Sequence, residues 1–317
     1  MKAVYVTEYG DLESLVYGER PPLEIHREEV LVRMRASSLN RRDLFAREGS
    51  HGTRRERELP RVLGLDGAGD VVEVGDGVPN LRIGDRVLGV FSSGSHAEYA
   101  KAHYSDLYNL PENLSYTEGA SIPVVFSTAW HLLICKSGLR LGEDVLIMSA
   151  GSGVGIAAIQ IAKKVGCRVF TTASSEQKLQ YAKDLGADEG INYSTEDFSD
   201  KVLDLTNGRG VDVVLDHIGA SVWEQCFASL KTGGRFINCG VTAGYRADLH
   251  LGKLWTRDLT IMGSSMRPRE DLPKLLPLFQ RGDLKAVVAK TFPLEQAILA
   301  HSLLESSDFF GKVILIS

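Results

Sequence analysis

The chain has 317 residues, of which 44% are hydrophobic and 24% are charged, a composition typical of a soluble globular protein. This length suggests two domains, each large enough to bury a hydrophobic core. The formal net charge of −5 argues against nucleic acid or an anionic membrane as a partner.

Targeting and membrane signals are weak. No apolar run reaches the roughly 18 residues of a membrane-spanning helix, and the N-terminus lacks the apolar core of a signal peptide. The four cysteines are scattered, without a C-x-x-C pair: Cys135, Cys167, Cys226 and Cys239. Such cysteine usage fits a reducing compartment and argues against disulfides or a cysteine-built zinc site. We therefore expect a cytoplasmic protein.

The N-terminal part of the chain, up to about residue 120, is β-rich. Short alternating segments at 3–6, 30–36, 69–74 and 86–90 are separated by glycine-containing turn signals. This pattern predicts a small, partly closed barrel. One short helix is expected at 40–48, where Asn40 could be the N-cap.

From residue 117 helical segments appear, at 117–123 and 127–134, and strands then alternate with helices. The predicted strands are 145–148, 169–172, 190–193, 211–215 and 235–239, with helices at 178–185 and 222–230. This alternation predicts an α/β domain with a parallel sheet. The chain then gives a helix at 269–280, a strand at 286–292, a helix at 294–305 and a closing strand at 312–316, which we expect to pair back into the first domain.

The most informative stretch runs from Asp144 to Gly166. A short apolar strand leads into the glycine-rich turn Ala150–Gly155, and a helix with small residues on one face follows up to Lys164. Another strand comes next, which completes the βαβ unit that binds dinucleotides. Glycines let a pyrophosphate approach the helix N-terminus, where free N–H groups and the dipole favour an anion. Glycine-rich turns also join strands to helices with nothing bound, but the flanking elements favour cofactor binding.

Five motifs together resemble one protein family: Asn40-Arg41-Arg42-Asp43, Leu63-Gly64-Leu65-Asp66-Gly67-Ala68-Gly69, Phe126-Ser127-Thr128-Ala129-Trp130, the Ala150–Gly155 turn, and Phe310-Gly311-Lys312. The chain is similar to zinc-free medium-chain dehydrogenases/reductases, close to the quinone oxidoreductases. The resemblance implies an α/β fold in which a GroES-like β-rich catalytic domain (1–122 and 265–317) is interrupted by a Rossmann domain with a doubly wound parallel sheet (123–264). It also implies a homodimer or homotetramer.

The zinc question follows from the resemblance. The positions that match the catalytic zinc ligands of the alcohol-dehydrogenase branch are Asn40, Leu65 and Val124. Leu65 and Val124 carry no ligand atom, and Asn40 is a poor zinc ligand. The four closely spaced cysteines of the structural zinc lobe have no counterpart here. We therefore expect no metal site.

The cofactor's identity depends on the end of the second Rossmann strand. Ala173 stands where an acidic residue would hold the ribose hydroxyls of NAD. Ser174, Ser175 and Lys178 offer room and charge for a 2′-phosphate, and Tyr193 matches the family's tyrosine at that phosphate. Alternatively, one serine caps a helix and Lys178 is a solvated surface charge. The pattern favours NADPH.

Other cofactor contacts are implied by the resemblance alone. Besides the turn residues Ala150, Gly151, Ser152, Gly153, Val154 and Gly155, they are Asn40, Thr128, His217, Gly240, Val241, Thr242, Ser265, Met266 and Lys312. Each could equally be a packing residue. Cys239 is expected to be a small core residue rather than a reactive thiol.

Asn40 is the best candidate for the reacting centre, with Thr128 beside the nicotinamide by resemblance. The Asn40 amide could donate to cofactor or substrate, although a helix cap is a serious alternative. Many quinone oxidoreductases carry a tyrosine where this chain has Phe45, which cannot relay a proton. The proton donor is then Asn40, Thr128, a bound water or solvent. The charged Arg54–Arg57 loop could grip an acidic substrate tail, but a solvated loop is the simpler interpretation.

These observations predict a metal-free, NADPH-dependent reductase of a quinone or an α,β-unsaturated ketone or aldehyde. The alternative is an enoyl-thioester reductase of the enoyl-CoA type, for which the Arg54–Arg57 loop is the only local hint. A third reading is an NADPH-binding protein with little turnover, like a lens crystallin. Neither a nucleic acid nor a membrane is expected as a partner.

Overall fold

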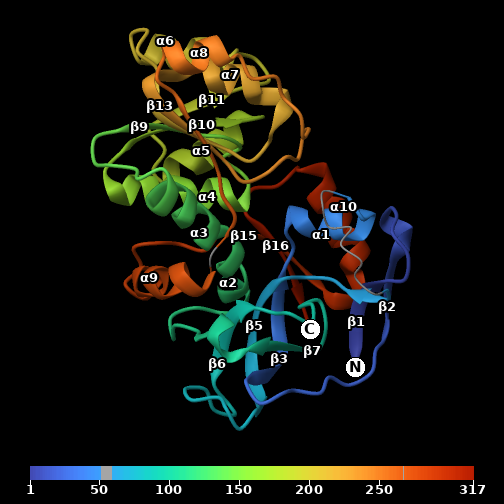
Figure 1. The fold of residues 1–317 in the computed structure, drawn as a ribbon. Helices are drawn as coiled ribbons and strands as arrows, with labels where there is room; N and C mark the ends of the chain where they lie inside the picture. Colours follow the sequence, from blue (N-terminus) through green and yellow to red (C-terminus); the bar gives the residue numbers. More distant parts are fainter. Residues whose placement is uncertain (51–58, 267) are drawn as a thin grey trace. The chain divides into compact units, whose positions relative to one another are not determined.

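The computed structural model describes residues 1–50, 59–266 and 268–317, and its ribbon is drawn in Figure 1. The chain forms two compact units, Met1–Val124 with Pro268–Ser317 and Val125–Arg267. The boundaries predicted from the sequence, after residues 122 and 264, lie close to these. The Arg54–Arg57 loop lies outside the described residues, so both interpretations of it stay predictions.

The first unit is built on two β-sheets. The smaller has the order β2 (Leu15–Glu19), β1 (Lys2–Val6), β4 (Arg61–Val62). The larger has the order β15 (Val288–Pro293), β16 (Lys312–Ile316), β3 (Glu29–Ser38), β5 (Asp66–Val74), β6 (Arg86–Val90), β8 (Leu107–Asn109), and β7 (Tyr99–His103) also pairs with β3. The helices of this unit are α1 (Arg41–Glu48), α2 (Tyr116–Ala120), α9 (Pro268–Gln280) and α10 (Ala297–Ser306).

Strand β3 shows why these residues form a half-buried sheet. Val30, Val32, Met34 and Ala36 alternate along it and are all at most 1% exposed, so one face of the strand enters the core. The C-terminal strand β16 pairs antiparallel with β3, with Ile314 opposite Ser38. The predicted return of the closing strand to the first domain is therefore confirmed.

The second unit is a parallel sheet with the order β11 (Glu189–Asn192), β10 (Arg168–Ala173), β9 (Asp144–Ile147), β12 (Val211–Asp216), β13 (Leu230–Asn238), β14 (Thr260–Gly263). Its helices are α3 (Pro123–Trp130), α4 (Gly153–Val165), α5 (Glu176–Asp184), α6 (Phe198–Leu205), α7 (Trp223–Ala228) and α8 (Leu251–Thr256). Figure 1 shows α4 on one side of the sheet and α6, α7 and α8 on the other. The winding direction reverses between β9 and β12, and ligands bind open α/β sheets at the carboxyl ends of strands at such a point.

Several local predictions were wrong. Pro123 begins helix α3 rather than ending a helix, because its fixed φ suits a first helical turn. The segment 131–136 continues from α3 as a π-helix. The helix predicted at 222–230 ends at Ala228, and the glycine pair 233–234 lies inside β13. Helices α6 and α8 and strand β14 were missed; β14 is only four residues long and mostly exposed.

Among the described residues, no helix is both long and apolar enough to cross a membrane.

Candidate active site

The glycine-rich turn lies between β9 and α4, as the sequence predicted. Ala150 is fully buried and its N–H donates to the Thr172 carbonyl of β10 at 2.8 Å, which fixes the turn on the sheet. Ser152 is the N-cap of α4, and its hydroxyl accepts from the Gly155 N–H at 2.9 Å. A Cβ on Gly155 would lie 2.3 Å from the Ser149 carbonyl oxygen, so only glycine fits there. The turn before the 13-residue helix α4 thus carries no bulky side chain at Gly155, so a pyrophosphate could approach the N–H groups at the helix N-terminus.

His217 meets this turn at the point where the sheet reverses. It follows β12, and its Nε2 atom is 2.9 Å from the Ser152 hydroxyl oxygen. Thr242, from the loop after β13, donates its hydroxyl to the His217 carbonyl at 3.3 Å. A Cβ on Gly240 would lie 2.6 Å from that same carbonyl oxygen. The structure therefore brings together the predicted residues of three separate loops: Ser152, His217, Gly240 and Thr242.

Asp216 holds two of these loops and was not recognised from the sequence. Its side chain is 1% exposed and accepts from the Ile218 N–H at 2.8 Å and from Asn238 Nδ2 at 2.8 Å. Burial raises the pKa of this carboxyl, and these hydrogen bonds oppose the rise. An acidic residue at the end of an apolar strand was the available signal. Nearby, desolvation raises the pKa of the Cys239 thiol to about 12, as expected for a packing residue and not for a nucleophile.

The residues predicted at the 2′-phosphate lie on two adjacent loops. Ala173 ends β10, and its carbonyl accepts from the Tyr193 N–H at 3.1 Å. Ser175 is the N-cap of α5, with its hydroxyl accepting from the Lys178 N–H at 3.4 Å. The alternative that one of these serines caps a helix is therefore correct for Ser175. Ser174 and Tyr193 are exposed on these loops.

Three further predicted residues belong to the second unit. Thr128 lies in α3 and is 8% exposed, and Ser265 and Met266 lie two and three residues after the end of β14. Val154 lies in the first turn of α4.

In the first unit Asn40 lies in a buried polar cluster. It is the N-cap of α1 and is 8% exposed. Its Nδ2 atom donates to Asp66 Oδ1 at 2.8 Å and, more weakly, to the Ser38 carbonyl at 3.3 Å. Its Oδ1 atom accepts from Lys312 Nζ at 2.7 Å. The amide therefore bridges a carboxylate and an ammonium, and a direct donation to substrate would compete with these bonds.

Asp66 is the centre of this cluster and was also not singled out by sequence reasoning. It is fully buried and accepts from the Ser38 hydroxyl at 2.8 Å and from the Val124 N–H at 3.0 Å, in addition to Asn40. Burial raises the pKa of its carboxyl, whereas Lys312 lowers it. Of the positions that match zinc ligands in the alcohol-dehydrogenase branch, Asn40 has its amide already hydrogen-bonded. Leu65, which precedes Asp66 in the chain, and Val124 are half-buried aliphatic residues.

Asp43 lies at the third position of α1, 3% exposed, and accepts from the Asn40 N–H at 2.7 Å. Burial raises the pKa of this carboxyl from 3.8 to about 6. Its neighbour His96 is fully buried, and burial lowers the pKa of its imidazole to about 3, so this ring is neutral. Phe45, whose ring cannot relay a proton, is half-buried on the same helix.

The raised pKa of Asp43 predicts a pH-dependent stability. The folded state holds the Asp43 proton up to about pH 6, whereas the unfolded chain releases it near 3.8. This contribution is fully present below the unfolded pKa and is lost as pH rises through about 6, a change of about 3 kcal/mol. The Asp43→Asn variant has no carboxyl to ionise. Its free energy of unfolding minus that of wild type should therefore be more positive at pH 7 than at pH 4. Urea unfolding at both pH values measures this, and an equal difference at both would contradict the assignment.

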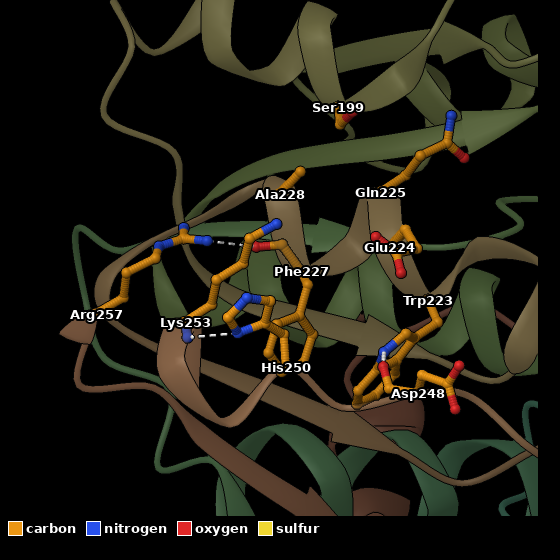
Figure 2. A pocket seen from close by; sticks show the side chains of 10 residues that line it. All are labelled: Ser199, Trp223, Glu224, Gln225, Phe227, Ala228, Asp248, His250, Lys253 and Arg257. Atoms are coloured by element: carbon orange, nitrogen blue, oxygen red, sulfur yellow. Dashed lines mark hydrogen bonds between the residues drawn. The ribbon is translucent and has the colours of Figure 1, made fainter. Parts of the chain in front are cut away.

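A cavity of about 510 Å³ lies in the second unit (Figure 2). Its lining comes from α6, α7, α8 and the segment before α8, and Figure 2 shows basic and aromatic side chains on it. Trp223 packs on Phe227 with ring centroids 4.5 Å apart and donates its indole N–H to the Asp248 carbonyl. None of the predicted site residues lines this cavity, so we do not assign it to the cofactor.

Comparisons with known proteins agree with this arrangement. The family model of the alcohol dehydrogenase GroES-like domain matches residues 26–112, and that of the zinc-binding dehydrogenase matches residues 153–281. A quinone oxidoreductase of Pseudomonas aeruginosa is 32% identical, with 99% of each chain covered.

Two solved structures are also similar. Escherichia coli quinone oxidoreductase, solved with NADPH, has a TM-score of 0.92 and 29% identity over 100% of each chain. A structure titled as an NAD-dependent alcohol dehydrogenase has a TM-score of 0.95 and 39% identity over 100% of each chain.

A GroES-like barrel combined with a Rossmann sheet defines the medium-chain dehydrogenases/reductases, which are nicotinamide-dependent oxidoreductases. Within that class, this chain belongs to the quinone oxidoreductase family.

Proposed function

We propose that the protein is an NADPH-dependent reductase of a conjugated carbonyl compound, a quinone or an α,β-unsaturated ketone or aldehyde, and that it needs no catalytic metal. One observation carries the proposal. Leu65 and Val124 offer no ligand atom at two of the three zinc-ligand positions, and the third, Asn40, has its amide bonded to Asp66 and Lys312.

The residues of the second unit would bind and orient the cofactor, which supplies a hydride when bound. The N-terminus of α4, capped by Ser152, offers free N–H groups to the pyrophosphate. Asp216 holds the loops that carry His217 and Thr242 at the reversal point of the sheet.

The proposed substrate class follows from the negative charge that the reaction creates on the substrate oxygen. An alcohol dehydrogenase must stabilise a localised alkoxide, and zinc does so as a Lewis acid. When hydride adds to a conjugated carbonyl, the negative charge spreads over an enolate or quinol anion, which a few fixed hydrogen-bond donors can stabilise. The cluster around Asn40 supports this choice, because its polar side chains are buried and are held in place by hydrogen bonds.

Cofactor preference is the first test. Lys178→Ala should weaken NADPH binding roughly 10- to 150-fold, because a charge-assisted contact to the 2′-phosphate contributes about 1.5–3 kcal/mol. NADH binding should hardly change, since NADH lacks that phosphate. Titration of each cofactor by fluorescence measures both affinities, and Lys183→Ala, near the end of the same helix, is the matched control. Equal losses for both cofactors would rule out the NADPH assignment.

Substrate and metal dependence are tested together. Screening the wild-type protein with NADPH should give turnover of quinones or enones, before and after exhaustive chelation. Oxidation of simple alcohols with NAD or NADP should be negligible, although one similar structure carries an alcohol-dehydrogenase title. An enoyl-CoA in the same plate tests the thioester alternative, and no turnover of any substrate would favour the binding-protein alternative. Chelator-sensitive alcohol oxidation with one zinc per chain would overturn the proposal.

A further inference from the structure

Lys312 is a buried ammonium with an incomplete set of partners. The residue is 6% exposed, and its Nζ atom donates to the Leu39 carbonyl at 2.6 Å and to Asn40 Oδ1 at 2.7 Å. An ammonium has three hydrogens to donate. Within residues 1–50, 59–266 and 268–317, the third hydrogen has no acceptor.

The charge of Lys312 is also not neutralised by direct contact. Asp66 and Asp43 attract it electrostatically, but in the described part of the chain no carboxylate oxygen lies within 4.0 Å of Nζ. Both direct acceptors, the Leu39 carbonyl and the Asn40 amide, are neutral. Leaving water without a close counter-ion is unfavourable for a charged group, and burial accordingly lowers the pKa of Lys312. A ligand oxygen that gains negative charge would complete this environment.

The fold places the Lys312 ammonium next to Asn40, the residue that matches one of the zinc-ligand positions. Lys312 begins β16, and the pairing of β16 with β3 brings it to Asn40, 272 residues earlier in the chain. Gly311 has a φ of +119°, and a Cβ there would lie 2.8 Å from the Val287 carbonyl oxygen, so the backbone before Lys312 is fixed by a close approach. Asn40 in turn is held by Asp66. Asn40 and Asp66 are thus positioning residues for the ammonium.

We propose that the Lys312 ammonium stabilises the negative charge that develops in the reaction, and that its third N–H donates to the carbonyl oxygen of the conjugated substrate. This inference rests on the proposed function. Hydride forms the new C–H bond at the β-carbon, the π electrons shift toward oxygen, and the charge that develops there lies against the ammonium. The oxygen then takes one proton from Lys312 or from water, Lys312 is reprotonated from solvent, and the substrate is reduced while NADPH is oxidised to NADP⁺.

The experiment compares Lys312→Met, Lys312→Arg and the control Lys290→Met. Lys290 is an exposed lysine on the neighbouring strand β15, over the Phe292 ring. For Lys312→Met we expect kcat to fall about 100- to 1,000-fold, the effect of removing one preorganised donor at a developing oxyanion. NADPH affinity should stay within about threefold, Lys312→Arg should restore part of kcat, and Lys290→Met should resemble wild type.

Comparing an enone with a quinone distinguishes a catalytic role of Lys312 from a merely structural one. The charge is localised in the enolate of an enone and delocalised in a quinol anion, so Lys312→Met should slow enone reduction more than quinone reduction. A merely structural role would lower both rates equally, and that outcome would overturn the proposal. So would a kcat within about threefold of wild type.

Separate controls test whether the variant folds and whether the proposed function holds. If Lys312→Met unfolds, the Asp66→Asn/Lys312→Met double variant removes both charges and should fold yet remain slow. Fast enone reduction by the folded double variant would overturn the proposal. A wild-type protein that reduces neither substrate would overturn the proposed function and this inference with it, whereas active wild type with active Lys312→Met overturns the inference alone.

Discussion

Gly155→Ala is expected to abolish useful cofactor binding. The new Cβ would lie 2.3 Å from the Ser149 carbonyl oxygen and 3.0 Å from the Ser152 hydroxyl, so the turn itself must move. Ser152 would lose its place as the N-cap of α4, and the anion site at the helix N-terminus would be deformed. We expect the dissociation constant for NADPH to rise at least about 100-fold, which corresponds to about 2.7 kcal/mol.

Gly263→Ala is the matched control for this prediction. Gly263 lies in β14 of the same unit, and a Cβ there meets nothing within 4 Å. This variant should bind NADPH like wild type. Isothermal titration of both variants, with thermal melts to confirm folding, makes the comparison. Comparable affinities for the two variants would show that the turn does not hold the pyrophosphate.

The sequence predicted the glycine-rich turn and its flanking elements because their signals are local. The strand, the turn Ala150–Gly155 and the helix follow one another within one βαβ unit, so their spacing alone indicates an anion site. The two loops after β10 and β11 were likewise predicted through Ala173 and Tyr193, which the structure joins by a backbone hydrogen bond.

The polar cluster of the first unit could not be predicted in the same way. Lys312 and Asn40 were both named as site residues, but only by resemblance, and their contact depends on the register of β16 on β3. Asp66 and Asp43 were part of quoted motifs without an assigned role. The three positions that match zinc ligands carry no cation themselves. Lys312 reaches Asn40 from the far end of the chain, through the pairing of β16 with β3.

Asp66→Asn is expected to be the most destabilising of these substitutions. The carboxylate is fully buried and accepts hydrogen bonds from Ser38, Asn40 and Val124, while Lys312 lies nearby as a positive charge. An asparagine has one oxygen to accept with, and it leaves the Lys312 ammonium without a main counter-charge. Removing one partner of a buried charge network typically costs about 3–5 kcal/mol, and we expect a loss of unfolding free energy in that range.

The control is Asp70→Asn on the same strand β5. The Asp70 side chain is 21% exposed, accepts from the Tyr116 hydroxyl and pairs with Arg35, whose side chain is 41% exposed. Solvent therefore screens the charge of Asp70 more than that of the fully buried Asp66. Substitution of Asp70 should cost about 1 kcal/mol or less. Urea unfolding of both variants at neutral pH measures the difference. Equal losses would mean that Asp66 contributes no more than an ordinary surface carboxylate.

A double-mutant cycle then decides whether the cost arises from charge or from shape. Asp66→Asn leaves an uncompensated ammonium, and Lys312→Met leaves an uncompensated carboxylate, whereas the double variant buries neither charge. Because Asn40 bridges the two groups at 2.7 and 2.8 Å, we expect a strong coupling, with the double variant losing at least about 1 kcal/mol less than the sum of the single losses. Additive losses would mean that each residue acts only through its own packing. A coupling of the expected sign would instead show that Asp66 and Lys312 stabilise each other through the Asn40 amide that is hydrogen-bonded to both.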